Sequence, residues 1–167
     1  MQVIELKITD IKQLDKSILI YGAGKYASIF LTYLQTQGIN SSVKGCIVSQ
    51  IDDNKVFLSD LSVKSVDEIE DLKSYTIVIA IAKENAEAIY HKLEEQGVDI
   101  GYQVTSEMIA DMASEIATFF SLYPIDENKV FIDCFEGLGY RCNCKYLAEA
   151  LKKYDYEIVW NLSDRAV

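Results

Sequence analysis

The residues with the clearest chemical potential are Gly22, Gly24, Lys25 and Tyr26, which lie in the hexapeptide Gly-Ala-Gly-Lys-Tyr-Ala at 22–27. This spacing fits the Gly-x-Gly-x-x-Gly/Ala form of a dinucleotide-binding turn. The first glycine allows a tight turn, the second lets a pyrophosphate approach, and the small third residue lets helix and strand pack closely. Free backbone N–H groups at the start of the following helix attract phosphate. We therefore expect these four residues to bind a nucleotide-type ligand.

Further candidates lie where two other predicted strands end. Ser49 follows the apolar run 43–48, and Ala82 and Lys83 stand at the end of the run 76–82. Ligands of open parallel sheets bind beyond the carboxyl ends of the strands. We expect Ser49, Ala82 and Lys83 to face the same crevice as the glycine turn. For Lys83, a solvated helix start is the alternative.

The carboxylate that usually binds the ribose of NAD is missing from its expected position. An NAD site has Asp or Glu at the end of the second strand, where this chain has Ser49 and Gln50. Asp52 and Asp53 come later, in what we expect to be a solvated loop. NAD is therefore disfavoured, which leaves another nucleotide, a nucleotide sugar, or a turn that serves only as scaffold.

The four cysteines and the single histidine do not predict a metal site or a nucleophile. Cys46 and Cys134 fall inside predicted strands, where cysteine behaves as a small apolar residue. Cys144 shares a helical stripe with other apolar residues, and Cys142 is alone in a predicted loop. His91 lies on a predicted helix, far from every cysteine in the sequence. Because the spacings match no standard zinc pattern, we predict no metal ligands and no catalytic residues.

The composition is that of a globular protein. Half of the 167 residues are apolar, a quarter are charged, and the formal net charge is −10. This acidic balance argues against nucleic acid and against an electrostatic grip on anionic lipid. No apolar stretch approaches the ~20 residues of a membrane span, and the first residues do not resemble a signal peptide. A cytoplasmic location is the expectation.

Strand and helix signals alternate through most of the chain. The apolar run 17–21 is typical of a strand buried on both faces, and helical spacing follows until Gly38. A second helix follows the run 76–82 and ends at Gly97. Weaker signals predict a short helical element within 1–16, an extended segment at 55–63, and a short helix at 65–72 with a capping box. Alternation of this kind predicts a Rossmann-like, doubly wound, mainly parallel α/β sheet with helices on both faces.

A long helical pattern then runs from Thr105 to about Tyr123, and its apolar face extends from Ile109 to Phe120. Such a face could close a sheet edge, join a second unit, or pair two subunits. Pro124 ends the pattern. A fresh unit follows, with a strand at 130–135, a glycine turn at 137–139, a helix at 143–154 and a strand at 157–160. We therefore predict two domains, 1–122 and 123–167.

Two stretches resemble known families. Residues 18–97, with Tyr-Gly-Ala-Gly-Lys-Tyr at 21–26 and Ile-Val-Ile-Ala at 77–80, resemble a Rossmann-like module of bacterial surface-polysaccharide proteins. The module is similar to the amino-terminal halves of sugar acetyltransferases and nucleotide-sugar dehydratases, and also precedes some methyltransferases and glycerophosphotransferases. The resemblance implies a nucleotide or nucleotide sugar as ligand.

The second stretch resembles the opening of the CDP-glycerol glycerophosphotransferase family, which builds teichoic-acid-like polymers at the membrane. The similarity covers about forty residues and is most distinctive in Tyr-Glu-Ile-Val-Trp-Asn-Leu-Ser-Asp at 156–164. Other shared positions are residues 128–132, Gly139, Tyr140, Asn143 and 145–147. Where the family has Ser-Asp-Asn-Pro-Lys, this chain has Arg-Cys-Asn-Cys-Lys at 141–145.

The family's transfer residues lie downstream of the stretch that this chain matches, so the resemblance assigns no catalytic residue here. It implies the leading portion of such a transferase, in the cytoplasm or at the inner face of the membrane, with a transferase domain or a second copy as partner. One alternative is a structural or dimerisation module with an empty crevice. Another is the leading part of an S-adenosylmethionine-dependent methyltransferase, with a strand at 130–134 and a glycine loop at 135–139.

Overall fold

A computed structural model describes residues 1–14, 17–51, 57–133 and 142–161 of the chain. Contacts within the chain divide it into two compact units, Met1–Leu122 and Tyr123–Val167. Asp52, Asp53, Cys134, the glycine turn at 137–139 and residues 162–164 of the family-like stretch lie outside the described residues.

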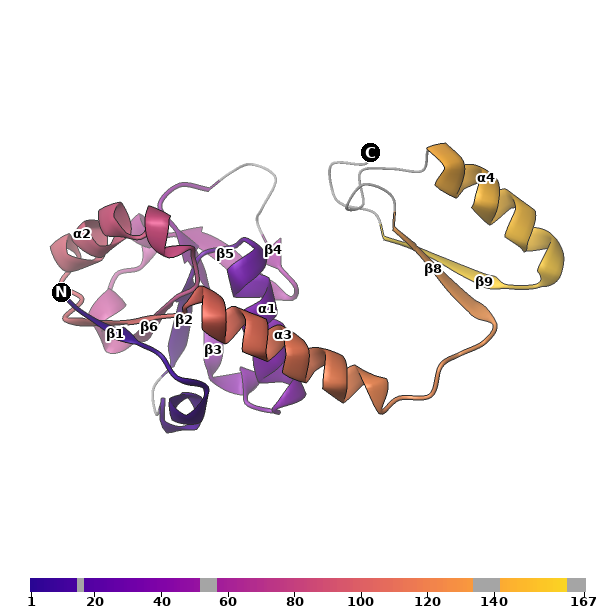
Figure 1. The fold of residues 1–167 in the computed structure, drawn as a ribbon. Helices are drawn as coiled ribbons and strands as arrows, with labels where there is room; N and C mark the ends of the chain where they lie inside the picture. The colour runs from indigo at the N-terminus through magenta and orange to yellow at the C-terminus, as the bar shows by residue number, and fades with distance from the viewer. Residues whose placement is uncertain (15–16, 52–56, 134–141, 162–167) are drawn as a thin grey trace. The chain divides into compact units, whose positions relative to one another are not determined.

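The described part of the first unit is built on one seven-stranded sheet (Figure 1). Its strands run in the order β1 (Gln2–Glu5), β7 (Ile100–Gln103), β6 (Thr76–Ile79), β2 (Ile18–Tyr21), β3 (Val43–Val48), β5 (Leu61–Ser65) and β4 (Phe57–Leu58). All neighbouring pairs are parallel except β4 and β5, which form an antiparallel edge.

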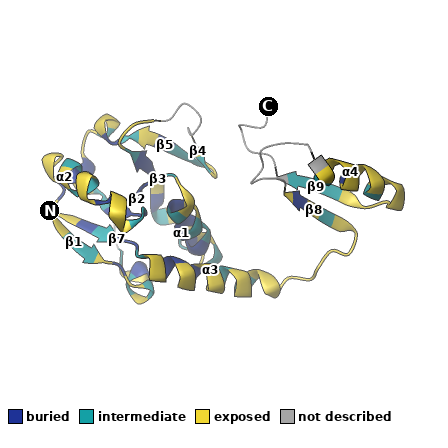
Figure 2. Ribbon diagram, turned by 45° about the horizontal axis from the view of Figure 1, so that its top comes forward, coloured by how far each residue is buried: buried dark blue, intermediate teal, exposed yellow. Residues whose placement is uncertain are grey.

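The central strands are apolar because both faces of the sheet are covered. All four residues of β2 are buried, and β6 is buried from Ile77 to Ile79. Tyr21 is aligned with Ile79 of β6 on one side and with Ile47 of β3 on the other. The apolar runs that predict these strands therefore occupy the middle of the sheet, which is dark blue in Figure 2.

Helices cover both faces. The helices α1 (Lys25–Thr36) and α3 (Ser106–Ser121) pack against each other over one face, where Phe30 and Met112 belong to the same core cluster. The helix α2 (Glu87–Glu95) buries Leu93 in a second cluster, together with Ile77 and Ile79 of β6. The predicted fold class, a Rossmann-like, doubly wound, mainly parallel α/β sheet, is confirmed.

The predicted helix ends are also present. Gly38 has φ +70° after α1, and the Ile39 N–H donates to Leu34 O at 3.0 Å. Gly97 has φ +78° after α2, and the Val98 N–H donates to Leu93 O at 3.0 Å. Glycine is the residue that adopts this left-handed backbone without steric cost.

The short helical element predicted within 1–16 is the 3-10 helix η1 (Ile8–Gln13). The edge strand β1 at residues 2–5 and the strand β7 have no counterpart in the sequence prediction. The segment predicted as extended at 55–63 contains the hairpin of β4 and β5 in its described part. The helix predicted at 65–72 is replaced by two 3-10 turns, η3 (Val66–Glu68) and η4 (Leu72–Ser74). Two further 3-10 turns are η2 (Asn40–Ser42) and η5 (Lys83–Asn85).

The apolar face of α3 is divided between two environments. Met108, Ile109 and Met112 are buried in the core, whereas Phe120 is 55% exposed. The last turns of the helix extend past the sheet (Figure 1). The α3 face from Ile109 to Phe120 is the one predicted to pair two subunits. Its first half, which includes Ile109, therefore packs against the core of the unit itself. Among the described residues, no helix has the length and apolarity needed to cross a bilayer.

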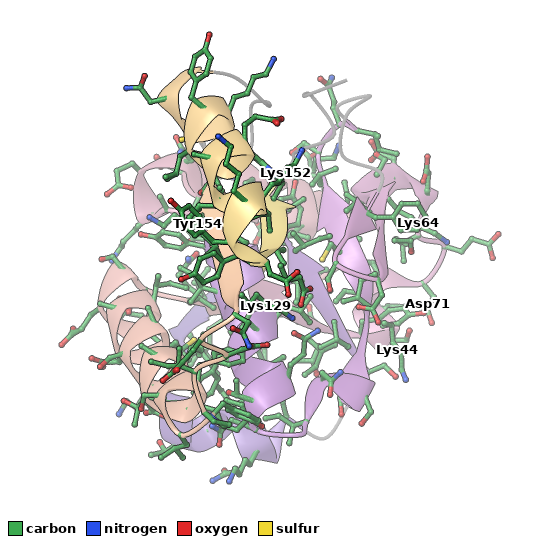
Figure 3. All side chains as sticks on the ribbon, turned by 90° about the vertical axis from the view of Figure 1, so that its right-hand side faces the viewer. Lys44, Lys64, Asp71, Lys129, Lys152 and Tyr154 are labelled. Atoms are coloured by element: carbon green, nitrogen blue, oxygen red, sulfur yellow. The ribbon has the colours of Figure 1, made fainter. Side chains whose placement is uncertain are left out.

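The second unit is a small βαβ element. Its described parts are β8 (Lys129–Asp133), α4 (Cys142–Leu151), the 3-10 turn η6 (Lys152–Tyr154) and β9 (Glu157–Asn161), with β8 and β9 parallel. Ile132 of β8 and Ala148 of α4 are buried. Lys129 and Glu157 form an ion pair of 3.2 Å across the strands, and Tyr154 is 71% exposed (Figure 3).

Candidate functional site

The candidate site lies where the strand order of the first unit reverses. From β2 the chain passes through α1 to β3 and β5, and it later returns to the other side of β2 with β6. The carboxyl ends of β2 and β6 therefore flank a topological switch point, the usual place for a ligand in an open α/β sheet. The segments that leave these two strands are the glycine turn after Tyr21 and the loop after Ile79.

At Gly22 there is no room for a side chain between these two segments. Its φ is +125°, and a Cβ atom there would lie 2.7 Å from the carbonyl oxygen of Ala80 and 3.0 Å from Cγ2 of Ile81. The Gly22 N–H extends the sheet by donating to Ile47 O at 2.8 Å. The first glycine of the motif therefore serves backbone packing, because any side chain would push the two loops apart.

Gly24 has a different role at the start of α1. It is the N-cap residue, is exposed, and has no atom within 4 Å of where a Cβ would stand. The helix's first hydrogen bond runs from the Ser28 N–H to Gly24 O at 3.0 Å, so the N–H groups of Lys25, Tyr26 and Ala27 precede the helical ladder. The first turn of α1, all of which is described, has no acidic residue and no side-chain cap. This geometry favours an anion.

Ser49 is drawn into a separate network. Its hydroxyl lies 2.6 Å from the Tyr21 hydroxyl, and its carbonyl oxygen accepts a hydrogen bond from Lys92 Nζ of α2 at 3.3 Å. Lys92 also pairs with Asp67 at 2.8 Å. The polar groups of Ser49 are thus engaged with Tyr21 and α2, and the expectation that Ser49 faces the glycine turn has no contact supporting it among the described residues.

Tyr26 and Lys83 do come together, in a pocket of about 270 Å³ at the carboxyl edge of the sheet. Ala82 lies just before Lys83, as the N-cap of η5. The rest of the pocket lining comes from β1, η5, β7 and the start of α3, namely Glu5, Glu84, Gln103, Thr105, Ser106 and Glu107.

The charges around this pocket are mixed. Lys83 Nζ lies 3.4 Å from Oε1 of Glu5, but both side chains are mainly exposed, so the pair is weak. The pocket is lined by three glutamates and one lysine, which makes it unfavourable for a second anionic group. Carboxylates in such a lining accept hydrogen bonds from hydroxyl and amino groups.

Gln103 is a site residue that the sequence analysis missed. It is 2% exposed at the end of β7, and its side chain bridges to the loop after β6 and to α2. Tyr90 of α2 donates its hydroxyl to Gln103 Oε1 at 2.8 Å. Burial raises the pKa of the Tyr90 hydroxyl, and the charge of Glu5 raises it further. Gln103 stands two residues before Thr105, whose hydroxyl caps α3 by accepting from the Met108 N–H. No local pattern marks the contacts of Gln103 with the loop after β6 and with α2.

The cysteine and histidine residues take structural positions where they are described. Cys46 is buried in β3, and burial raises the pKa of its thiol to about 11. His91 is exposed on α2. Among the described residues, no three His, Cys, Asp or Glu side chains are grouped as metal ligands would be. The Cys142 side chain is outside the described set.

Comparison with known proteins yields no relative whose functional residues could be aligned with these. No protein family matches the sequence, and neither a curated protein nor a solved structure is significantly similar to the chain.

Proposed function

We propose that the first unit binds a small phosphate-bearing ligand, of the nucleotide or nucleotide-sugar kind, at the glycine turn after β2. The observation that carries this proposal is the start of α1. There Gly24 is open to solvent, and the N–H groups of Lys25, Tyr26 and Ala27 precede the helical ladder at the switch point of the sheet. The Lys25 side chain, which is exposed, adds positive charge beside them.

The neighbouring pocket supports a ligand with a neutral second part. Tyr26 joins the helix start to this pocket, whose glutamates would repel a phosphate but accept hydrogen bonds from sugar hydroxyls or from an exocyclic amine. Its volume of about 270 Å³ is just below the range of roughly 300–1,000 Å³ usual for small-molecule sites. We therefore place the phosphate at Gly24 and Lys25, and a sugar-sized or base-sized group beside Lys83.

NAD is the less favoured nucleotide. The residue after β3 is Ser49, whose hydroxyl lies 2.6 Å from Tyr21 and which offers no carboxylate for a ribose. Asp52 and Asp53 belong to the part of the chain that is not described.

The resemblance of the second unit to the glycerophosphotransferase family extends the proposal to the protein as a whole. We propose that the chain is the leading portion of a CDP-glycerol glycerophosphotransferase-like protein of teichoic acid or capsular polysaccharide synthesis, acting in the cytoplasm or at the inner membrane face. The first unit would bind ligand without catalysis of its own. The described residues offer no histidine in the pocket that could act as a base, since the single histidine, His91, lies on α2.

Thermal unfolding in the presence of a ligand panel tests this proposal. The panel is CDP-glycerol, CMP, a UDP-sugar, NADH and S-adenosylmethionine. A genuine ligand at a hundredfold excess over its dissociation constant should stabilise the protein by about 2.7 kcal/mol. Stabilisation by S-adenosylmethionine alone would favour the methyltransferase alternative, and no response to any compound would favour a structural module with an empty crevice.

Two variants decide whether a response comes from the glycine turn. Gly24→Val should abolish it, because the new side chain occupies the open approach to the N–H groups while the backbone, at φ −99°, accepts valine. Lys44→Gln is the matched control. Lys44 is an exposed lysine near the amino end of β3 (Figure 3), so its charge is lost away from the site. A response that survives Gly24→Val would contradict the placement.

A further inference from the structure

Gln103 is the one buried polar side chain among the core residues of the described chain. It ends β7, where the register places it beside Ile79 of β6 and Glu5 of β1. An amide at this depth loses its hydration, so it must find partners within the protein. The groups that bond to the Gln103 amide show which segments it holds together.

The amide of Gln103 bonds to four groups, which belong to the end of β6, the two loops that follow β6 and β7, and α2. The two N–H groups of its Nε2 are shared among three carbonyl oxygens, those of Val104 at 2.8 Å, Ile81 at 3.0 Å and Ile79 at 3.1 Å. Its Oε1 accepts the hydrogen bond from Tyr90 at 2.8 Å. Because the Tyr90 hydroxyl faces the oxygen, the NH₂ group is directed at the carbonyls.

These bonds tie together the parts of the candidate site that lie far apart in sequence. Ile81 stands two residues before Lys83 and directly after Ala80, whose carbonyl oxygen would lie 2.7 Å from a Cβ atom at Gly22. Val104 precedes Thr105, the cap of α3, which lines the same pocket as Lys83. One amide therefore links the loop after β6, which lies beside the glycine turn, to the segment between β7 and α3.

We infer that Gln103 is the positioning residue of this site, with Tyr90 as its orienting partner. Its amide sets the conformation of the loop at 80–83, and through that loop the spacing between the glycine turn and the pocket. The conformational role stands on the hydrogen bonds alone. Its consequence for ligand binding rests on the function proposed above.

Hydrogen exchange without ligand tests the conformational role. Gln103→Met keeps the length of the side chain and removes its donors, whereas Gln103→Glu keeps the oxygen facing Tyr90 and replaces the NH₂ group by an acceptor. Both should raise exchange at least tenfold at Asn85 and Ala86, whose N–H groups donate to Ala82 and Lys83 in η5. Exchange at Leu31 and Leu34, in the buried part of α1, should stay unchanged.

Tyr90→Phe is the milder variant, since it keeps the NH₂ donors of Gln103 and removes only the Tyr90 hydroxyl that orients them. It should raise exchange at Asn85 and Ala86 about threefold, and it decides the question if both Gln103 variants fail to fold. Unchanged exchange in these variants would overturn the inference. An equal rise at Leu31 and Leu34 would also overturn it, because Gln103 would then stabilise the whole unit without positioning the loop.

Titration with pyrophosphate tests the consequence for binding. By calorimetry, Gln103→Met should weaken pyrophosphate binding at least fivefold relative to the wild-type chain, with Tyr90→Phe intermediate. Unchanged affinity in Gln103→Met would remove the positioning role. If the wild-type chain does not bind pyrophosphate, the proposed function fails, and hydrogen exchange still decides the role of Gln103 in the loop.

Discussion

Replacement of Gly22 by alanine tests whether the glycine turn is built as described. Two costs arise at this position. The backbone has φ +125°, which an L side chain rarely adopts, and the added Cβ would stand 2.7 Å from the Ala80 carbonyl oxygen. The obstacle is backbone on a neighbouring loop, so it cannot turn away as a long side chain would. Either the glycine turn or the loop after β6 must shift.

The expected loss of stability follows from these two costs. Holding a non-glycine residue in a sparsely populated backbone region costs about 1–3 kcal/mol. Inserting a methyl group into a packed contact costs about 1–3 kcal/mol more. The sum of roughly 2–6 kcal/mol is a large share of the 5–15 kcal/mol that usually stabilises a domain. We expect Gly22→Ala to lower the free energy of unfolding by an amount within this range.

Urea unfolding followed by circular dichroism measures the effect, and Gly24→Ala is the matched control. Gly24 has φ −99° and no atom within 4 Å of a new Cβ, so its replacement should cost only about 1 kcal/mol or less, through the preference of an N-cap for glycine over alanine. Equal urea midpoints for the two variants would contradict this prediction, because the lack of space between Gly22 and Ala80 would then have no energetic consequence.

Three further predictions concern the core and the helices. Met112→Ala should cost about 2–5 kcal/mol, because Met112 is completely buried, whereas Phe120→Ala on the same helix should cost about 1 kcal/mol or less; comparable losses in urea unfolding would contradict the division of the α3 face. Thr105→Ala should cost about 0.5–2 kcal/mol through loss of the α3 cap, and Thr105→Ser, which keeps the hydroxyl, should recover most of it in the same assay. The Cys46 thiol, with its pKa raised from 9.0 to about 11, should resist alkylation at pH 8 in the folded chain and react after unfolding; its burial should also make stability fall between about pH 9 and pH 11, because the unfolded chain releases the proton first. Fast labelling of Cys46 in a peptide map of the folded protein would disprove its burial.

The central layer of the fold can be predicted from the sequence because its signals are local. The strand β2 and the helix α1 follow from an apolar run, a glycine turn and regular apolar spacing, all within residues 17–38. The strand β6 follows from a longer run rich in β-branched residues. In these segments, the sequence pattern that predicts a strand or helix lies within the residues that form it.

The edge strands give no such signal because their stability comes from partners distant in sequence. The strand β1 has exposed residues at both ends and pairs with β7, almost a hundred positions later. Gly101 lies within β7 and weakens its apolar pattern, and the reason for a glycine there is visible only in the structure. A Cβ there would lie 2.9 Å from Cδ1 of Ile79, so the glycine makes room for a core side chain.

The candidate site also contains residues that the sequence predicts and residues that it does not. The hexapeptide at 22–27 predicts the turn at Gly22 and Gly24, and the rule for strand ends predicts Lys83 at the same crevice. In the structure Lys83 lines a pocket with Tyr26, and neither glycine is among the residues that line it. The rule did not foresee that the Ser49 hydroxyl bonds to Tyr21, or that Gln103 holds the loop after β6. Both depend on hydrogen bonds between segments that are distant in sequence, which a single sequence does not encode in its local pattern.

Titration of pyrophosphate into the ¹⁵N-labelled chain, followed through its amide resonances, tests most directly whether the start of α1 binds phosphate. We expect saturable shifts, with one dissociation constant, at Gly24, Lys25 and Tyr26, and their loss in Gly24→Val. No movement at these amides, or shifts confined to surface lysines such as Lys44 and Lys64, would contradict it.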